Sequence, residues 1–193
     1  RELIAARAKI AAAEKLAEEG LAVPAETLRR WLQAEGHAPW RRRRRKHRER
    51  RERKEHFGEL VQMDGSHHRW FGSKRPEACL MNMVDDAQGT TMSSMCEEET
   101  TEGAMRLLWR WVETHGIPRA LYTDRKTVFI TDREPTLEEQ LAGEEPKTAF
   151  GKACAKLEIA IIPANSPQAK GRVERNHGVY QDRLVKEMSL KRI

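Results

Sequence analysis

The 193-residue sequence predicts an α/β domain in which helices flank a five-strand mixed sheet, with a short helical segment before it. Three observations support this prediction. The first 40 residues have a helical composition rich in Ala, Leu, Lys and Glu. From Phe57 onward, short apolar stretches of strand length alternate with helical patterns. A run of basic residues at 41–56 separates the two regions.

The N-terminal segment predicts two short helices. Residues 3–19 favour a helix that ends at Gly20, and Pro24 is well placed to begin a second helix that closes at Gly36. Two helices joined by a tight turn are the outline of a helix-turn-helix, although most helical hairpins bind no DNA. We therefore interpret residues 1–40 as a helical, helix-turn-helix-like DNA-binding remnant.

The basic run carries the positive charge of the whole chain. Residues 41–56 hold eleven Lys or Arg and three Glu, a net charge of +8, whereas the whole chain has only +6. A run of this kind binds polyanions by releasing condensed counterions, without sequence preference. A solvated linker or a targeting signal is the alternative. We expect this linker to contact DNA through its first five side chains, Arg41, Arg42, Arg43, Arg44 and Arg45.

The rest of the chain, residues 57–193, predicts the main domain. Strands are expected at 58–66, 78–86, 90–96, 120–124 and 159–163, the last of the fully buried kind, and helices at 101–115, 150–157 and from Ser166-Pro167 to about Leu190. Residues 130–147 hold six carboxylates and little periodicity, so we expect an acidic, mobile insertion. The order β-β-β-α-β-α-β-α matches a ribonuclease-H-like fold.

Three acidic residues lie on the elements that this fold brings to one edge of its sheet. Asp64 is within the first strand, Asp124 ends the fourth, and Glu174 is on the last helix, one position from the core-facing Val173. Phosphodiester transfer needs charge stabilisation and an in-line nucleophile, which two magnesium ions about 3.5–4 Å apart supply. We predict that these carboxylates hold Mg²⁺, with Mn²⁺ tolerated. A single acidic residue at a strand end would be an ordinary turn residue.

Other polar residues are candidates for roles near the three carboxylates. Asp85 and Asp86 end the second strand and are expected to shape its turn rather than to serve as spare metal ligands. His67 and His68 have no third ligand at zinc spacing, so a surface or DNA-backbone contact is expected. His177 lies one turn beyond Glu174. Basic side chains that bracket Glu174 are expected to face DNA phosphates, or else to be ordinary solvated charges: Lys170, Arg172 and Arg175.

Three motifs carry a family resemblance. QMDGS around Asp64, YTDRKTVF around Asp124 and IPANSPQAKGRVERNHGVYQDRL around Glu174 resemble the integrase core of bacterial insertion-sequence DDE transposases, over about residues 57–190. The spacing between Asp124 and Glu174 is larger than in retroviral integrases, and it resembles a branch of that family with an acidic insertion. The resemblance implies metal-dependent nicking at element ends, which frees a 3′-hydroxyl that attacks target DNA. It also implies double-stranded DNA as substrate and a homo-oligomeric synaptic complex.

Composition excludes several other classes. No apolar run is long enough to span a membrane and no secretory signal is present, so a cytoplasmic, nucleoid-associated bacterial protein is expected. The three cysteines form no ligand pair and read as buried hydrophobic residues. Because the chain starts at Arg1 and stops inside a helical pattern, we expect a piece of a longer protein. The alternatives to a transposase are a ribonuclease-H-like nuclease that does not join DNA, or a DNA-binding relic.

Overall fold

The computed structural model describes residues 12–36, 52–72, 75–164 and 171–191. Its contacts divide the chain into two units, which are described separately here. One contains residues 50–177, and the other contains residues 1–49 together with 178–193. None of the helices in the described ranges is long and apolar enough to cross a membrane.

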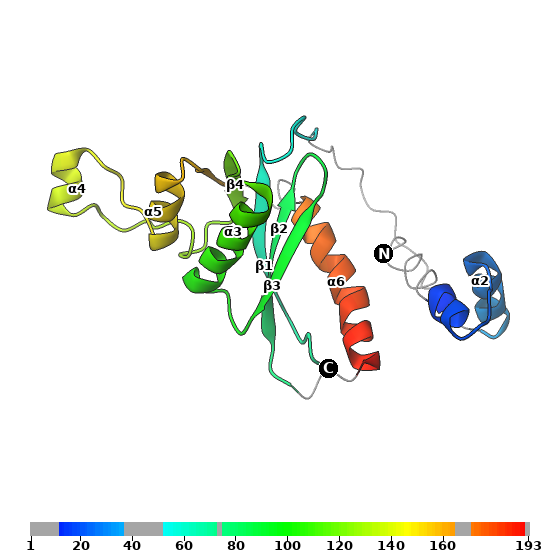
Figure 1. Cartoon of the computed structure of the whole chain (residues 1–193). Helices are drawn as coiled ribbons and strands as arrows, with labels where there is room; N and C mark the ends of the chain where they lie inside the picture. Colours follow the sequence, from blue (N-terminus) through cyan, green and yellow to red (C-terminus); the bar gives the residue numbers. More distant parts are fainter. Residues whose placement is uncertain (1–11, 37–51, 73–74, 165–170, 192–193) are drawn as a thin grey trace. The chain divides into compact units, whose positions relative to one another are not determined.

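The larger unit is built on a five-strand mixed sheet with the order β3-β2-β1-β4-β5 (Figure 1). Strands β1, β2 and β3 form an antiparallel meander, whereas β4 and β5 add in parallel to the other edge of β1. The strand bounds are β1 Val61–His68, β2 Ala78–Asp85, β3 Thr91–Cys96, β4 Ala120–Thr123 and β5 Ala160–Pro163. The predicted ribonuclease-H-like sheet is therefore confirmed.

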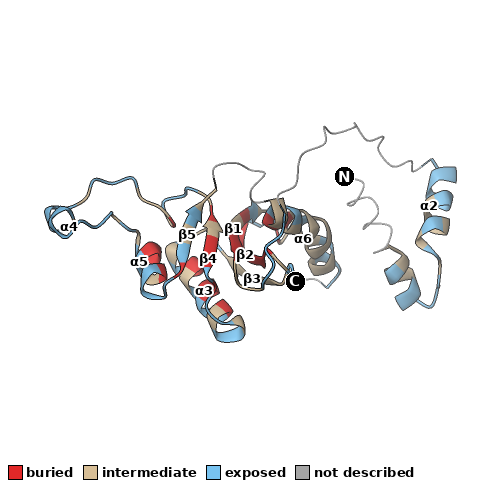
Figure 2. Cartoon of the chain, turned by 90° about the horizontal axis from the view of Figure 1, so that it is seen from above, coloured by how far each residue is buried: buried red, intermediate tan, exposed pale blue. Residues whose placement is uncertain are grey.

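Helices α3 (Thr101–His115) and α5 (Ala149–Lys156) cover one face of the sheet. Thr100 caps α3 by accepting a hydrogen bond from the Gly103 amide, as a helix N-terminus requires. The face of α3 at Ala104, Leu107, Leu108 and Trp111 is buried, and it packs with the odd-numbered residues of β1 and β2: Val61, Met63, Cys79, Met81 and Met83. This apolar layer is the core of the unit, and the buried colour of Figure 2 is concentrated there.

The opposite face of the sheet carries the even-numbered side chains of β1 and the start of α6 (Gly171–Leu190). Side chains alternate between faces along a strand, so Gln62 and Asp64 point away from the α3 layer. The α6 backbone at Val173 bonds to the Gln62 side chain, and Asn176 donates to the Thr91 hydroxyl at 2.7 Å. These contacts hold the first two turns of α6 on this face.

The N-terminal unit contains a helical segment at residues 12–18 and helix α2 (Ala25–Ala34), with Pro24 at its N-cap. Both predicted helices are therefore present within the described residues. None of the α2 residues is buried, and Trp31 is 56% exposed. Arg183, in the second half of α6, pairs with Glu14 at 2.7 Å.

One expectation about packing is corrected. Strand β5 lies at the edge of the sheet, so Ile162 is 41% exposed, and the strand is not the fully buried kind. On α6, Val173 is buried, as its expected core-facing position requires, whereas Tyr180, Leu184 and Met188 are half-buried. The predicted start of that helix at Ser166-Pro167 lies outside the described residues.

The acidic insertion contains a helix that the sequence analysis did not predict. It contains a short helix, α4 (Leu137–Ala142), which opens with a capping box formed by Thr136 and Glu139. Arg133 forms ion-paired hydrogen bonds with Glu139, one of them at 2.7 Å. The two ends of the insertion meet at the core, where Phe129 and Phe150 pack edge to face at 5.3 Å and the Thr148 hydroxyl donates to the Phe129 carbonyl. Between these ends, α4 projects away from the sheet (Figures 1 and 2).

Candidate active site

Asp64 and Asp124 lie at matching positions of two neighbouring parallel strands. The last paired residues of β1 and β4 are Gln62 and Tyr122, and each aspartate follows its strand's paired residue by two. A spacing of two returns the side chain to the same face, so the two carboxylates leave the sheet at the same edge and on the same side. Their side chains are 13% and 22% exposed, which leaves both accessible to solvent and to a ligand.

Helix α6 meets this edge of the sheet through His177. His177 is 7% exposed, and its Nδ1 lies 4.0 Å from Asp64 Oδ2. Glu174 precedes His177 by three residues, so both are on the same side of α6. The Glu174 side chain is exposed, whereas its neighbour Val173 is fully buried. The structure therefore brings Asp64 and Asp124 to the same edge, and Glu174 lies about one helical turn before His177.

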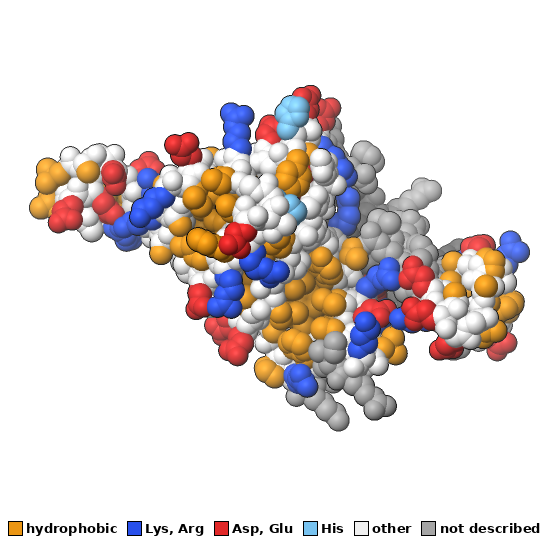
Figure 3. Space-filling model, viewed as in Figure 1, with side chains coloured by type: hydrophobic (Ala, Val, Ile, Leu, Met, Phe, Trp, Pro, Cys, Tyr) orange, Lys and Arg blue, Asp and Glu red, His pale blue; other side chains and the backbone are white. Residues whose placement is uncertain are grey.

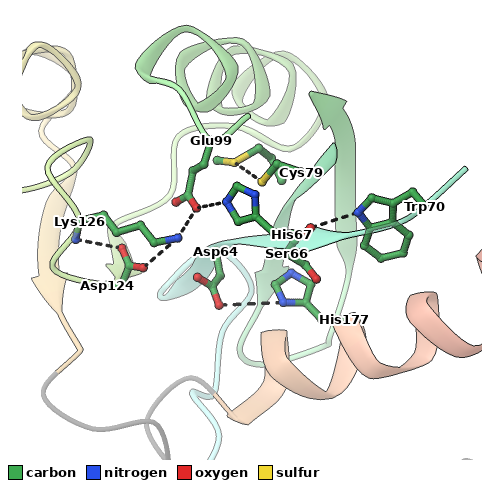
Figure 4. Close-up of polar contacts among 10 residues, drawn as sticks. Asp64, Ser66, His67, Trp70, Cys79, Glu99, Asp124, Lys126 and His177 are labelled. Atoms are coloured by element: carbon green, nitrogen blue, oxygen red, sulfur yellow. Dashed lines mark hydrogen bonds and ion pairs between the residues drawn. The ribbon is translucent and has the colours of Figure 1, made fainter. Parts of the chain in front are cut away.

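A lysine lies between the two aspartates and a further acidic residue (Figure 4). The Lys126 ammonium is 3.6 Å from Asp124 Oδ2 and forms a short ion pair with Glu99. Burial lowers the pKa of Lys126, but the Glu99 hydrogen bond and the charges of Glu99, Asp124 and Asp64 outweigh that effect and raise it. Lys126 therefore stays protonated at neutral pH and balances the negative charge of this group.

A second group of possible metal ligands lies next to the first. His67, Cys79 and Glu99 each present one ligand atom, all within 4.8 Å of one another. His67 thus has acidic and thiol neighbours that its sequence spacing did not reveal. Burial, and then the charge of Glu99, raises the pKa of Cys79 to about 12, so its sulfur is a protonated thiol at neutral pH. The Lys126 ammonium pairs with the same Glu99 carboxylate, which makes these three side chains a poor match for a cation site.

Gly65, directly after Asp64, is closed to side chains. A Cβ built there would overlap the Glu99 carboxylate and would lie 2.9 Å from the Cys79 sulfur. Real Cβ atoms essentially never approach other atoms that closely, so the close packing of Glu99 against β1 requires glycine at this position.

The basic residues predicted to contact DNA are placed unequally. Arg175 is exposed on α6, whereas Arg172 is 19% exposed and its Nη1 lies 2.7 Å from Asp86 Oδ1. Arg172 therefore points into the domain and is not an ordinary solvated charge. The remaining predicted contacts lie outside the described residues: Lys170 and the run Arg41, Arg42, Arg43, Arg44 and Arg45.

Asp85 and Asp86 are both fully buried, and they have different roles. Asp85 accepts hydrogen bonds from the backbone amides of Gly58 and Gln88, so it shapes the turn after β2 as expected. Asp86 instead accepts from Gln62 and pairs with Arg172.

Sequence reasoning missed Glu99 and Lys126 as members of the site. Their contact joins residues 27 positions apart, and no spacing rule within one strand or helix indicates it. The signal that was available for Lys126 is its place two residues after Asp124, at the carboxyl end of β4, where ligands of α/β sheets gather.

Two curated proteins are similar in sequence to this chain. The chain is 40% identical over 184 residues to the transposase y4bF of Sinorhizobium fredii, covering 94% of this chain and 39% of that protein. It is 36% identical over 138 residues to the transposase for insertion sequence IS1202 of Streptococcus pneumoniae, covering 70% of this chain and 28% of that protein. No family model matches.

Over most of its length, this chain is therefore similar to two known transposases. Solved structures agree on the fold of this chain. The catalytic core domain of HTLV-2 integrase in complex with magnesium matches with a TM-score of 0.51 and 21% identity, over 68% of this chain and 73% of that one. The simian T-cell lymphotropic virus intasome in complex with a PP2A regulatory subunit matches with a TM-score of 0.55 and 23% identity, over 78% of this chain and 47% of that one.

The chain spans well under half the length of the curated relatives that it matches.

Proposed function

We propose that this chain is the catalytic core of a transposase that cuts DNA at the ends of a mobile element and joins the freed 3′-ends to target DNA. The observation that carries the proposal is the matched register of Asp64 and Asp124, with Glu174 about one helical turn before His177, whose Nδ1 lies 4.0 Å from Asp64. The names of the two related transposases point to the same activity.

The side chains at this edge fit a divalent metal. Asp64, Asp124 and Glu174 offer carboxylate oxygens, the donors that Mg²⁺ and Mn²⁺ prefer, and all three retain access to solvent. A related fold, the HTLV-2 integrase core, has been solved with magnesium. We infer that the three carboxylates hold Mg²⁺, with Mn²⁺ as an accepted substitute. When bound, the metal would stabilise the charge that develops on the phosphate and orient the attacking oxygen.

The reaction would proceed as two displacements at phosphorus. In the first, water attacks the phosphodiester at the element end; its oxygen bonds to phosphorus, the bond to the 3′-oxygen breaks, and that oxygen leaves as a hydroxyl. In the second, the freed 3′-hydroxyl attacks a target phosphodiester and replaces one of its bridging oxygens. Lys126, whose ammonium faces Asp124, is placed to attract the negatively charged backbone to the carboxylates.

Double-stranded DNA is the proposed partner, both as element ends and as target. The net charge of +8 in residues 41–56 supports a sequence-independent backbone contact. We further propose that copies of the protein associate in a synaptic complex at the bacterial nucleoid, since two element ends must be held together for joining.

The test is incubation of the full-length protein with labelled element ends, target plasmid and Mg²⁺. A transposase yields both nicked ends and joined products. Nicked products without joining would indicate a ribonuclease-H-like nuclease, and binding without either product would indicate a DNA-binding relic. Asp64→Asn protein serves as the control for contaminating nuclease.

A further inference from the structure

A buried polar cluster joins the first turn of α6 to the sheet. Gln62 and Asp86 are both 0% exposed. Gln62 Nε2 donates to Asp86 Oδ1 at 3.0 Å, while Gln62 Oε1 accepts from the backbone amide of Val173 at 3.2 Å. The Arg172 guanidinium lies 2.7 Å from the same Asp86 oxygen, and the Lys54 amide donates to the other oxygen at 2.9 Å.

The cluster answers two physical requirements at once. A buried backbone amide needs an acceptor, and Gln62 supplies one for Val173. A buried carboxylate is tolerated only when it is paired and hydrogen-bonded, and Asp86 has the Arg172 charge together with two N–H donors. Because each member bonds to another, removal of one takes a hydrogen-bonding partner from a buried polar group.

The cluster lies close in sequence to two of the proposed metal-binding carboxylates, Asp64 and Glu174. Gln62 precedes Asp64 by two residues in β1, and Arg172 precedes Glu174 by two residues in α6. The same connection therefore fixes the strand that carries one carboxylate and the helix turn that carries another. The backbone distance from the cluster to Asp64 is about 7 Å, the rise of two strand residues.

We propose that Asp86, Arg172 and Gln62 are positioning residues for the third carboxylate: they hold the first turn of α6 at the height where Glu174 can share a metal with Asp64. This inference rests on the proposed function, in which Glu174 is a metal ligand. It assigns Arg172 a role inside the domain, distinct from the DNA contact of an exposed arginine such as Arg175.

Asp86→Asn is the first test, and Asp85→Asn is its matched control. Both residues are carboxylates with 0% exposure at the end of β2, and both accept backbone amides, but Asp85 contacts the turn rather than α6. Hydrogen exchange is measured by mass spectrometry on peptides that cover residues 171–177 in the full-length protein. Asp86→Asn should accelerate exchange there, whereas Asp85→Asn should accelerate it only around residues 58 and 88.

Binding of Mn²⁺, followed by the loss of the free-ion electron paramagnetic resonance signal, gives a second readout. Loss of groups that orient metal ligands weakens metal affinity by about 10- to 100-fold, so Asp86→Asn should require at least tenfold more Mn²⁺ than Asp85→Asn. In the nicking assay, Asp86→Asn should lower kcat at saturating DNA and leave the KM for DNA unchanged.

Two substitutions at Arg172 separate positioning from DNA contact. Arg172→Met removes the charge but keeps an unbranched apolar side chain, and it should reproduce Asp86→Asn, while Arg172→Lys should restore part of the metal affinity. Equal exchange in the Asp86→Asn and Asp85→Asn proteins would overturn the proposal. The proposal would also be overturned if Arg172→Met lost DNA affinity while Asp86→Asn showed no slower turnover. If the wild-type protein neither nicks nor joins, the proposed function fails, whereas the exchange and Mn²⁺ measurements still decide the positioning role.

Discussion

Asp64 and Asp124 leave neighbouring parallel strands at the same level, each two residues beyond the paired positions Gln62 and Tyr122. Two like charges held side by side repel each other, and the nearby Lys126 ammonium offsets part of this repulsion. The arrangement concentrates carboxylate oxygens at a solvent-accessible edge, and it is the basis of the first prediction.

Conversion of Asp64 or Asp124 to Asn, or of Glu174 to Gln, should abolish nicking and joining while DNA affinity stays nearly unchanged. The physical reason is that carboxylates would hold the metal, whereas affinity comes mainly from Lys and Arg. Product formation on labelled ends and a filter-binding titration measure the two properties. A Glu174→Gln protein that nicks at the wild-type rate would contradict the assignment.

Neutralisation of the run Arg41, Arg42, Arg43, Arg44 and Arg45 to Gln should weaken binding to all DNA sequences alike. The slope of log K against log salt should become shallower by up to about 0.9 for each lost phosphate contact. Binding of cognate and unrelated duplexes across a salt series is the measurement. Loss of affinity for the cognate end alone would show that the run reads sequence instead.

Trp111→Ala should destabilise the larger unit by about 3–5 kcal/mol, the usual cost of removing a buried aromatic side chain. Trp111 is fully buried and stacks on Phe57, with ring centroids 6.0 Å apart. Trp109→Ala is the control on the same helix, since Trp109 is 68% exposed and should change stability by less than about 0.5 kcal/mol. Urea denaturation followed by circular dichroism compares the two, and similar midpoints would refute the described core.

Glu139 should titrate far below an ordinary glutamate. Its hydrogen bonds with Arg133, and then with the Thr136 amide, lower the pKa of Glu139 from 4.5 to about 2. Because the folded pKa is depressed, the contribution of this carboxylate to the order of α4 is complete above pH 4.5. It is lost as pH falls toward about 2. Nuclear magnetic resonance titration of the side-chain carboxyl tests this, with Arg133→Ala expected to return the midpoint toward 4.5. A wild-type midpoint near 4.5 would show that the capped helix is not maintained in solution.

Replacement of residues 132–145 by a short Gly/Ser linker should leave folding and single-end binding intact but reduce paired-end complexes. The segment is acidic and α4 exposes Leu137 and Leu141, 72% and 82% exposed, on a lobe that projects from the core (Figure 3). We expect it to dock on the basic run of another copy. Gel-shift analysis of paired-end complexes is the measurement. Unchanged assembly and joining would mean that the lobe is a solvated loop, and unfolding would mean that it is required structure.

The periodicity of the sequence predicted most of the sheet, because β1 and β2 each bury alternate residues against α3. The strand expected at 58–66 overlaps β1 and the strand expected at 78–86 contains β2, and Val61 and Met63 lie on one face with Gln62 and Asp64 on the other. The edge position of β5 was not predictable, since an apolar stretch of four residues looks the same at the centre and at the edge of a sheet.

One helix was not predicted although its local signal is present in the sequence. Thr136 followed three residues later by Glu139 is a capping-box pattern, and it begins α4 within the segment 130–147 that was expected to be an acidic, mobile insertion. The neighbours of the aspartate pair are a different case. His177 was expected on the same side of α6 as Glu174, but its burial against Asp64 depends on how the helix packs on the sheet. Contacts of this kind follow from tertiary structure and have no counterpart in a single sequence.

The two ends of the acidic insertion contact each other, so the length of the insertion does not set the spatial separation of the residues on either side. Phe129 and Phe150 contact each other in the core, and Thr148 bonds back to Phe129, so the intervening residues leave and return at one point. Lengthening such an excursion costs little, because each doubling of a flexible loop adds only about 0.6 kcal/mol of closure entropy. The interval between Asp124 and Glu174 can therefore grow or shrink by whole modules while the carboxylates stay where they are. An evolving mobile element could exchange this lobe, and any contacts that the lobe makes, without rebuilding its chemistry.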